Sequence, residues 1–202
     1  YLSAFPNIVV MAPGDELDVA PMLDFAPSHQ GPSSLRYPKT AAGRIERDAE
    51  EVRLGCAEVL RWGEDGTFFA FGSLVSNCMA AAEQLGNEGL DVGVVNARFL
   101  RPLDRDILGR ALRETGFVIT VEESTLCGGF GSAVLEAANE AGWPTTRLRR
   151  LGLPDRFIEH GERGELLADL GLDVKGLIDT AREMAACRDS GVTADHESIS
   201  SH

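Results

Sequence analysis

The 202-residue sequence lacks the features that mark membrane, secreted and nucleic-acid-binding proteins. No apolar run approaches the roughly 20 residues that a membrane-spanning helix needs, and no signal peptide opens the chain. Basic residues are few: 19 Lys and Arg stand against 32 Asp and Glu, which gives a formal net charge of -13. Such a surface repels nucleic acid and anionic membranes, so we expect neither a nucleic acid nor a membrane as a partner.

The four cysteines form no motif. They are scattered without the spacing of metal ligands, and three of them lie among apolar neighbours. This pattern is typical of small core residues in a reducing compartment. We therefore expect no metal site in the chain and a cytoplasmic location.

The chain also lacks an initiator methionine, and Tyr1 leads at once into a strand-like segment. We therefore expect a cut piece of a longer protein, without any function that depends on upstream residues. The composition is ordinary for a globular protein, with 44% apolar and 25% charged residues. The length allows one sizeable core, or one domain with part of another.

The first 40 residues predict a strand, a helix and a second strand. Residues 8–11 are apolar and Pro13 follows them, which indicates a short buried strand. Asp15 can cap a helix of about ten residues, and residues 34–37 predict the second strand. The expected inward positions of the helix are Leu17, Val19, Met22 and Leu23.

Residues 41–54 carry mixed charge with little apolar periodicity. They indicate a linker that crosses the surface, and therefore a domain boundary. We expect residues 1–40 to end one α/β domain and residues 55–187 to form a second domain. Residues 188–202 are polar and rich in serine, which predicts a disordered tail.

Strand-like runs alternate with amphipathic helical segments in the second domain. Residues 56–62 and 68–71 flank a Gly-Glu-Asp-Gly stretch, a signal typical of a β-hairpin. The alternation implies βαβ units, so we predict an α/β fold with a mostly parallel sheet and helices on both faces. Further strands are expected at residues 92–95, 117–121 and 146–151, and helices at residues 74–85, 102–112, 131–141, 162–170 and 173–187.

Several strings in the sequence are specific to a family. Residues 96–104 read NARFLRPLD, and residues 118–132 contain VITVEE followed by GGFGS. Both resemble the C-terminal domain shared by transketolases, 2-oxo acid dehydrogenase beta subunits and deoxyxylulose-phosphate synthases. Residues 152–161 (GLPDRFIEHG), residues 31–39 (GPSSLRYPK) and the opening residues 1–13 are similar to the synthases in particular. The collinear motifs cover nearly everything but the tail.

The resemblance implies a thiamine-diphosphate enzyme that condenses pyruvate with D-glyceraldehyde 3-phosphate, releases carbon dioxide and forms 1-deoxy-D-xylulose 5-phosphate. Thiamine diphosphate would supply the carbanion chemistry and Mg²⁺ would anchor its diphosphate. The product feeds the synthesis of isoprenoid, thiamine and pyridoxal precursors, and the family forms homodimers. Residues 1–40 would then end the pyrimidine-binding domain, and residues 55–187 would be the transketolase C-terminal domain.

The same resemblance implies that the catalytic residues lie upstream. The diphosphate site of the family needs a Gly-Asp-Gly stretch followed by an Asn ligand, and the sequence has neither. We therefore expect no catalytic, cofactor-binding or metal-binding residue in this chain. It should bind no cofactor alone and should be inactive alone.

One substrate contact of the family falls within the chain. The second position after Tyr37 is commonly an Arg that holds the phosphate of the aldehyde, and here it is Lys39, followed by Thr40 in place of the usual Gly. Lysine keeps the charge but lacks the planar fork of arginine. The alternative is a solvated lysine at the start of the linker. Arg36 is a possible supporting residue, but it points away from Tyr37 on a strand, and a structural ion pair is the simpler expectation.

Two further features have both a functional and a structural interpretation. The turn at residues 128–131 could hold an anion through backbone N–H groups, although packing against a neighbouring domain or subunit is the commoner use of such turns. Glu122 and Glu123 end a predicted parallel strand, where such folds place their sites. Paired carboxylates suit acid–base catalysis, but no second half of a site is visible. We expect residues 101–103 and the turn to contact the middle domain or the second subunit.

Two alternative functions remain. A 2-oxo acid dehydrogenase beta subunit shares the Arg-Pro-Leu-Asp and Val-Glu-Glu elements, but it is not expected to carry residues 152–161 or 36–39 in this form. A non-catalytic assembly module built from this domain is a different class, and the start of the chain within a strand argues against it.

Overall fold

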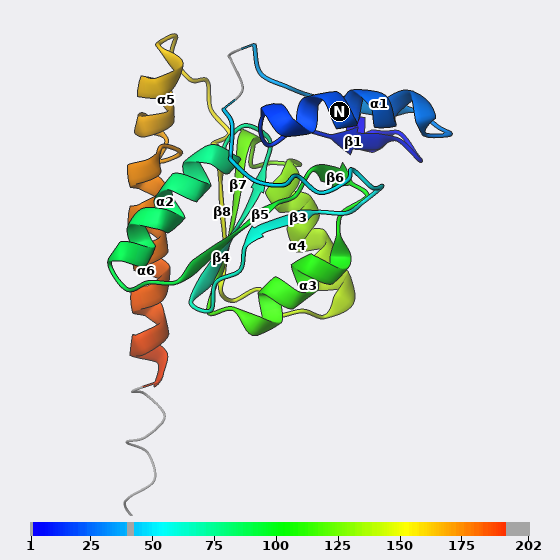
Figure 1. The fold of residues 1–202 in the computed structure, drawn as a ribbon. Coiled ribbons are helices and arrows are strands. Elements are labelled where there is room, and N and C mark those ends of the chain that lie inside the picture. The colour runs from blue at the N-terminus through cyan, green and yellow to red at the C-terminus, as the bar shows by residue number, and fades with distance from the viewer. Residues whose placement is uncertain (1, 40–42, 193–202) are drawn as a thin grey trace, which may run out of the picture.

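The structure is a computed structural model, and it describes residues 2–39 and 43–192. Our expectations for Thr40 and for residues 193–202 lie outside the described residues. A five-stranded and a three-stranded sheet organise the chain (Figure 1). The strands are β1 (Val9–Met11), β2 (Ser33–Leu35), β3 (Glu58–Arg61), β4 (Gly66–Phe71), β5 (Val92–Asn96), β6 (Phe99–Arg101), β7 (Val118–Thr125) and β8 (Leu148–Leu153). The helices are α1 (Glu16–Ser28), α2 (Val75–Asn87), α3 (Arg105–Glu114), α4 (Phe130–Ala141), α5 (Arg163–Asp169) and α6 (Val174–Val192), with a 3-10 helix at Leu2–Ala4.

The five-stranded sheet has the order β3-β5-β4-β7-β8, and its pairs are parallel except for β3 with β5. Every residue of β4 is buried, because helices cover both faces of the sheet. α2, α5 and α6 pack on one face, and α3 and α4 pack on the other (Figure 1). The predicted fold class is confirmed.

The predicted hairpin between residues 56–62 and 68–71 is wrong. β3 pairs with β5, and β5 lies between β3 and β4 in the sheet. The chain does turn after β3, but this turn packs on the start of β5: a Cβ on Gly63 would lie 2.2 Å from the backbone N of Gly93. A turn signal is local, whereas β4 is apolar on both faces and takes the covered central position with a parallel neighbour on each side.

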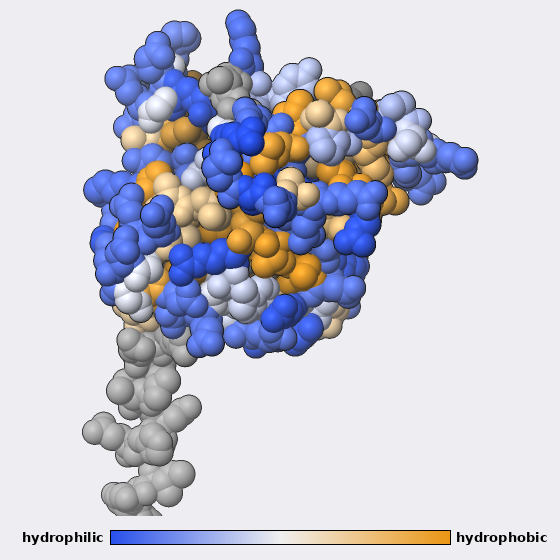
Figure 2. Space-filling view, viewed as in Figure 1, coloured by the Kyte–Doolittle hydropathy of each residue, from blue (hydrophilic) through white to orange (hydrophobic). Residues whose placement is uncertain are grey.

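The edge strand β3 carries apolar side chains to the surface. Val59 of β3 and Trp62, which follows the strand, are partly buried against the core. The guanidinium of Arg110 lies 4.0 Å from the centroid of the Trp62 ring. Figure 2 shows an apolar patch over β3, with hydrophilic residues around it. An apolar patch with a polar rim is the pattern of a protein interaction surface.

The strand order creates a crevice at one end of the large sheet. β4 connects through α2 to β5 on one side, and the chain then returns through α3 to β7 on the other side of β4. The order therefore reverses between β4 and β7. In open α/β sheets, ligands bind outside the carboxyl ends of the strands at such a point.

The three-stranded sheet joins the two predicted domains. β1 and β2 are parallel and connected by α1, as the strand-helix-strand prediction requires, and β6 from the second domain pairs antiparallel with β1. Asp15 caps α1 as expected, and Met22 shares a small core with Phe99. Leu23 is 54% exposed, so its predicted inward position is wrong; the neighbouring turn instead buries Asp18, which finds charged partners.

Two further predictions need correction. The linker is not wholly on the surface, because Val52 joins the small core and the Arg47 side chain is only 12% exposed. The helix α6 continues to Val192, past the expected start of the tail at residue 188. Residues 188–192 contain no proline, so the backbone hydrogen bonds of the helix can continue there.

Candidate functional site

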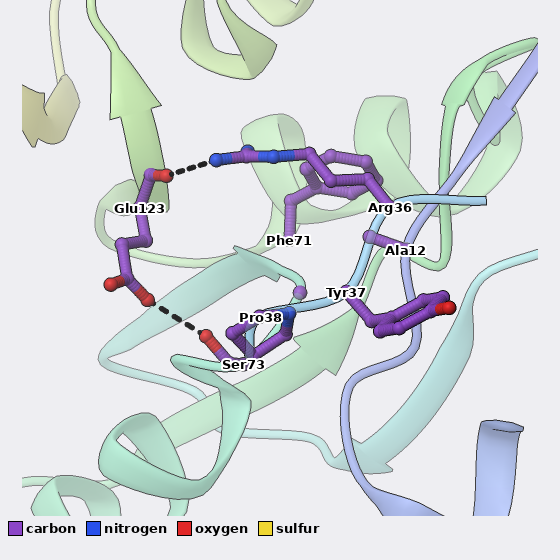
Figure 3. Close-up of a pocket in the computed structure, with 8 residues that line it drawn as sticks. Ala12, Arg36, Tyr37, Pro38, Phe71, Ser73 and Glu123 are labelled. Carbon is purple, nitrogen blue, oxygen red and sulfur yellow. Dashed lines mark hydrogen bonds between the residues drawn. The ribbon is translucent and has the colours of Figure 1, made fainter. Parts of the chain in front are cut away.

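A cavity of about 210 Å³ opens at the carboxyl ends of β4 and β7, where the strand order reverses. The segment that follows β2 crosses this end of the sheet and closes the cavity on one side (Figure 3). The two walls therefore come from the two predicted domains. The first wall consists of Ala12, Arg36, Tyr37 and Pro38, and the second of Phe71, Gly72, Ser73 and Glu123.

Arg36 lies in the first wall and reaches across to the second. β2 ends at Leu35, so Arg36 and Tyr37 lie beyond the strand that was predicted to contain them. Nη2 of Arg36 donates a hydrogen bond to the backbone oxygen of Glu123 at 2.9 Å, while Tyr37 points elsewhere (Figure 3). The contact is thus to a carbonyl instead of the carboxylate of an ion pair. A guanidinium has five N–H donors, so Arg36 can also bind a second acceptor.

Glu123 forms the second wall together with Ser73. Its carboxylate accepts hydrogen bonds from the Ser73 hydroxyl at 2.9 Å and from Nε of Arg163 at 2.8 Å. Arg163 begins α5, so the segment that starts at the end of β8 and carries residues 152–161 leads to a partner of Glu123. The Arg163 guanidinium holds the pKa of Glu123 below its usual range, although partial burial acts in the other direction. The Glu123 carboxylate is therefore the anionic partner of Arg163 at neutral pH.

Glu122 and the glycine-rich turn form one structure. The Glu122 side chain is buried, and its carboxylate accepts hydrogen bonds from the N–H groups of Phe130 and Gly131, both at 2.7 Å. Burial raises the pKa of Glu122, while these two donors and the guanidinium groups of Arg150 and Arg36 act against it. The anion at the start of α4 is thus a carboxylate of the chain itself, which favours the structural interpretation of both features.

Lys39 lies just past the cavity. It follows Pro38 of the first wall and is exposed, and it has no hydrogen bond or ion pair with any residue that the structure describes. Lys39 is the third residue after Arg36 in the sequence. Lys39 is not among the residues that line the cavity, and its contact with a phosphate stays a prediction.

A second cluster of charged residues, which no sequence pattern predicted, lies between α1, the linker and the large sheet. The carboxylates of Asp15, Asp18 and Glu58 meet the guanidinium groups of Arg47 and Arg98 there. Nη2 of Arg98 lies 2.7 Å from Asp18 and 2.9 Å from Glu58. The available signal was Asp18, an acidic residue on the inward side of a helix that also buries its apolar residues.

The described residues do not fit a metal-bound diphosphate. Among them, no group of three or more His, Cys, Asp or Glu could hold a metal ion, and the carboxylates of the second cluster are bonded to arginine. Of the four cysteines, Cys78 is buried as expected. Cys127 and Cys187 are exposed, so their predicted core positions are wrong, because one lies in the turn before α4 and the other near the end of α6. No helix in the described part of the chain could cross a membrane.

The fold and the position of the cavity define a class of protein. The model of the transketolase C-terminal domain matches residues 55–177. The chain therefore belongs to the transketolase C-terminal domain family. Beyond this domain, its similarity extends along nearly the whole chain to proteins named 1-deoxy-D-xylulose-5-phosphate synthase.

Two of these relatives and one solved structure give the extent of the similarity. The chain is 45% identical over 179 residues to 1-deoxy-D-xylulose-5-phosphate synthase 1 of Geobacter sulfurreducens, covering 88% of this chain and 28% of that protein. It is 42% identical over 186 residues to the Rhodopirellula baltica synthase, covering 92% and 29%. A solved structure described as a split gene transketolase, inactive beta4 tetramer, matches with a TM-score of 0.83 and 28% identity, covering 92% of this chain and 60% of that one. The chain thus spans less than a third of the length of these two curated relatives.

Proposed function

We propose that the chain is the C-terminal part of a thiamine-diphosphate-dependent transferase, a 1-deoxy-D-xylulose-5-phosphate synthase. The complete enzyme would join pyruvate to D-glyceraldehyde 3-phosphate, release carbon dioxide and form 1-deoxy-D-xylulose 5-phosphate. The observation that carries this proposal is the 42–46% identity to three proteins of that name over about 90% of the chain. This similarity extends over more of the chain than residues 55–177 of the C-terminal domain.

We assign to this chain a part in holding the aldehyde substrate. With a net charge of -13, the protein needs a local group of cations to bind a phosphorylated molecule. Arg36 lines the cavity, and Lys39 follows Pro38 of the same wall in the sequence and is exposed. Lys39 would bind the phosphate directly, with Arg36 as a possible supporting residue.

Thiamine diphosphate would supply the carbanion chemistry when bound, and Mg²⁺ would anchor its diphosphate. We propose that both are held by residues outside this chain, and that the chain alone binds neither. The absence of a Gly-Asp-Gly stretch from the sequence supports this. The inactivity stated for the solved split gene transketolase is consistent with a chain that is inactive without its remaining domains.

We further propose that the complete enzyme is a cytoplasmic homodimer that makes precursors of isoprenoids, thiamine and pyridoxal. The apolar patch over β3 supports an interaction with another domain or subunit (Figure 2). Residues 101–103 and the turn before α4 are the candidate contacts. Light scattering on the complete enzyme would measure its mass, and a monomer at micromolar concentration would contradict this part of the proposal.

The first test is kinetic. The chain is extended upstream to its natural start, and the decarboxylation of pyruvate is measured with and without D-glyceraldehyde 3-phosphate. We expect strong stimulation by the aldehyde, with 1-deoxy-D-xylulose 5-phosphate as the product. Decarboxylation that the aldehyde does not stimulate, or acyl transfer to a lipoyl acceptor, would move the assignment to a 2-oxo acid dehydrogenase beta subunit. If the extended protein turns over no 2-oxo acid, the remaining assignment is a non-catalytic assembly module. Turnover by the 202-residue chain alone would contradict the proposal that this chain is inactive alone.

The second test concerns Lys39 in the extended enzyme. Lys39→Ala removes a charged hydrogen-bond donor, so the KM for the aldehyde should rise about tenfold while the KM for pyruvate stays unchanged. Lys175→Ala is the control, because Lys175 is an exposed lysine paired with Asp179 on α6. Equal effects of Lys39→Ala on both substrates would contradict the phosphate role.

A further inference from the structure

Arg47 of the linker contacts three carboxylates at once. Its Nη1 lies 2.6 Å from Asp15, its Nη2 lies 2.9 Å from Glu58, and the same Nη2 lies 3.4 Å from Asp18. A third nitrogen, Nε, donates to the other oxygen of Glu58 at 2.9 Å. Asp15 and Asp18 belong to the strand-helix-strand unit, and Glu58 begins the large sheet. One side chain of the linker therefore holds both units.

The carboxylates that contact Arg47 are shielded from water. The side chains of Asp15 and Asp18 are 0% exposed, and that of Glu58 is 3% exposed. Arg98, 1% exposed, also bonds Asp18 and Glu58. Two guanidinium groups thus serve three buried carboxylates. Loss of one guanidinium leaves buried charge without a partner, which is strongly unfavourable.

The backbone of the linker is held by the same carboxylates. The N–H of Ile45 donates to Asp15 at 2.8 Å, and the N–H of Glu50 donates to Glu58 at 3.0 Å. Asp15 and Glu58 therefore each bind both the backbone of the linker and the fork of Arg47. A guanidinium fork fixes direction as well as distance, which a lysine ammonium cannot do. Apolar contact between the units would be less directional.

We infer that Arg47 is a positioning residue, whose fork fixes the strand-helix-strand unit against the large sheet and so keeps the two walls of the cavity in register. The walls come from these two units, and Arg36 bonds Glu123 across the gap between them. The positioning role is a property of the chain alone. Its effect on catalysis rests on the proposed function.

Hydrogen exchange on the 202-residue chain tests the positioning role. In Arg47→Met, exchange in residues 9–35 should become about tenfold faster, while β4 and β7 stay within about twofold of the unchanged chain, because only the smaller unit is released. The matched control is Arg44→Met, which removes the same charge from the same linker at a half-exposed site bonded to Glu16 and Glu46. It should stay within about twofold in both units.

Equal exchange in the Arg47 and Arg44 variants, or an increase that is uniform over both sheets, would overturn the inference. If Arg47→Met does not fold, Asp15→Asn decides, because asparagine keeps an oxygen for the cap of α1 and removes one charge from the cluster. It should accelerate exchange about threefold in residues 9–35 alone. No regional difference in Asp15→Asn would then overturn the inference.

A kinetic measurement separates positioning from the proposed function. In the extended enzyme, Arg47→Lys keeps the charge and loses the fork, so the KM for the aldehyde should rise about fivefold with kcat unchanged. A regional exchange effect without any change in KM would leave Arg47 as a positioning residue and contradict the substrate role of the cavity. A KM effect without regional exchange would contradict positioning and leave the substrate role in place.

Discussion

The two sheets of this molecule are held in different ways. The five-stranded sheet is covered on both faces by apolar side chains, with Phe68 and Phe69 fully buried on opposite sides of β4. The three-stranded sheet has a small apolar core around Met22 and Phe99. It also takes β6 from the second domain and lies beside a cluster of three carboxylates and two guanidinium groups.

This difference shows two ways of stabilising a unit. Burial of apolar surface is non-directional and grows with area, so it suits a large sheet with helices on both faces. A small unit buries little area, and charged hydrogen bonds can instead fix its orientation. The large sheet should therefore determine the stability of the molecule, and the charged cluster should determine how the smaller unit sits on it.

The largest effect is expected in the core of the large sheet. Phe68→Ala should lower the free energy of unfolding by about 4 kcal/mol, because a fully buried aromatic ring is replaced by a cavity. Urea denaturation followed by circular dichroism measures this change. Phe157→Ala is the matched control, because Phe157 is fully exposed, and its effect should stay below about 0.5 kcal/mol. Similar losses in the two variants would mean that the core is not where the structure places it.

A somewhat smaller effect is expected in the charged cluster. Arg98→Met should lower the free energy of unfolding by about 3 kcal/mol, because Asp18 and Glu58 would remain buried with one guanidinium fewer. The same denaturation experiment measures it. Arg182→Met, which removes a half-exposed guanidinium paired with Glu88, should leave the midpoint nearly unchanged. A negligible effect of Arg98→Met would remove the distinction between the two sheets.

The smallest effect concerns pH and the ion pair of Glu123 with Arg163. The pKa of Glu123 is lowered in the folded chain, so its stabilising contribution is present above the usual pKa of glutamate and is lost as the pH falls through the lowered value. Both side chains are partly exposed, so the contribution should be below about 1 kcal/mol. The unfolding midpoint of Glu123→Gln, measured between pH 3 and 7, should vary less with pH than that of the unchanged chain. Parallel pH profiles would exclude this contribution.

Most of the large sheet could be predicted from the sequence, because its signals are local. Runs of buried residues such as those in β5 and β7 alternate with helices of regular apolar spacing, which is sufficient for an α/β class. Asp15 was expected at a helix start, and it accepts a bond from the backbone of α1. The hairpin failed because the pairing of β3 with β5 depends on residues more than 30 positions apart.

The candidate site was predictable only in part. The strings at residues 31–39 and 152–161 indicated the family, and Arg36 does reach the cavity wall. The sequence did not indicate that Glu123 would be paired with Arg163, or that Glu122 would itself fill the turn before α4. These contacts join segments from different parts of the chain, so no local pattern records them.

The sequence by itself determined the alternation of strands and helices, the helix caps and the resemblance to a family, because each depends on residues close together in the chain. The tertiary structure alone decided the order of the strands, the transfer of β6 to the smaller sheet and the burial of Arg47 among three carboxylates. These features depend on which distant surfaces meet. An arginine in a polar linker looks solvated until the fold brings Asp15, Asp18 and Glu58 around it.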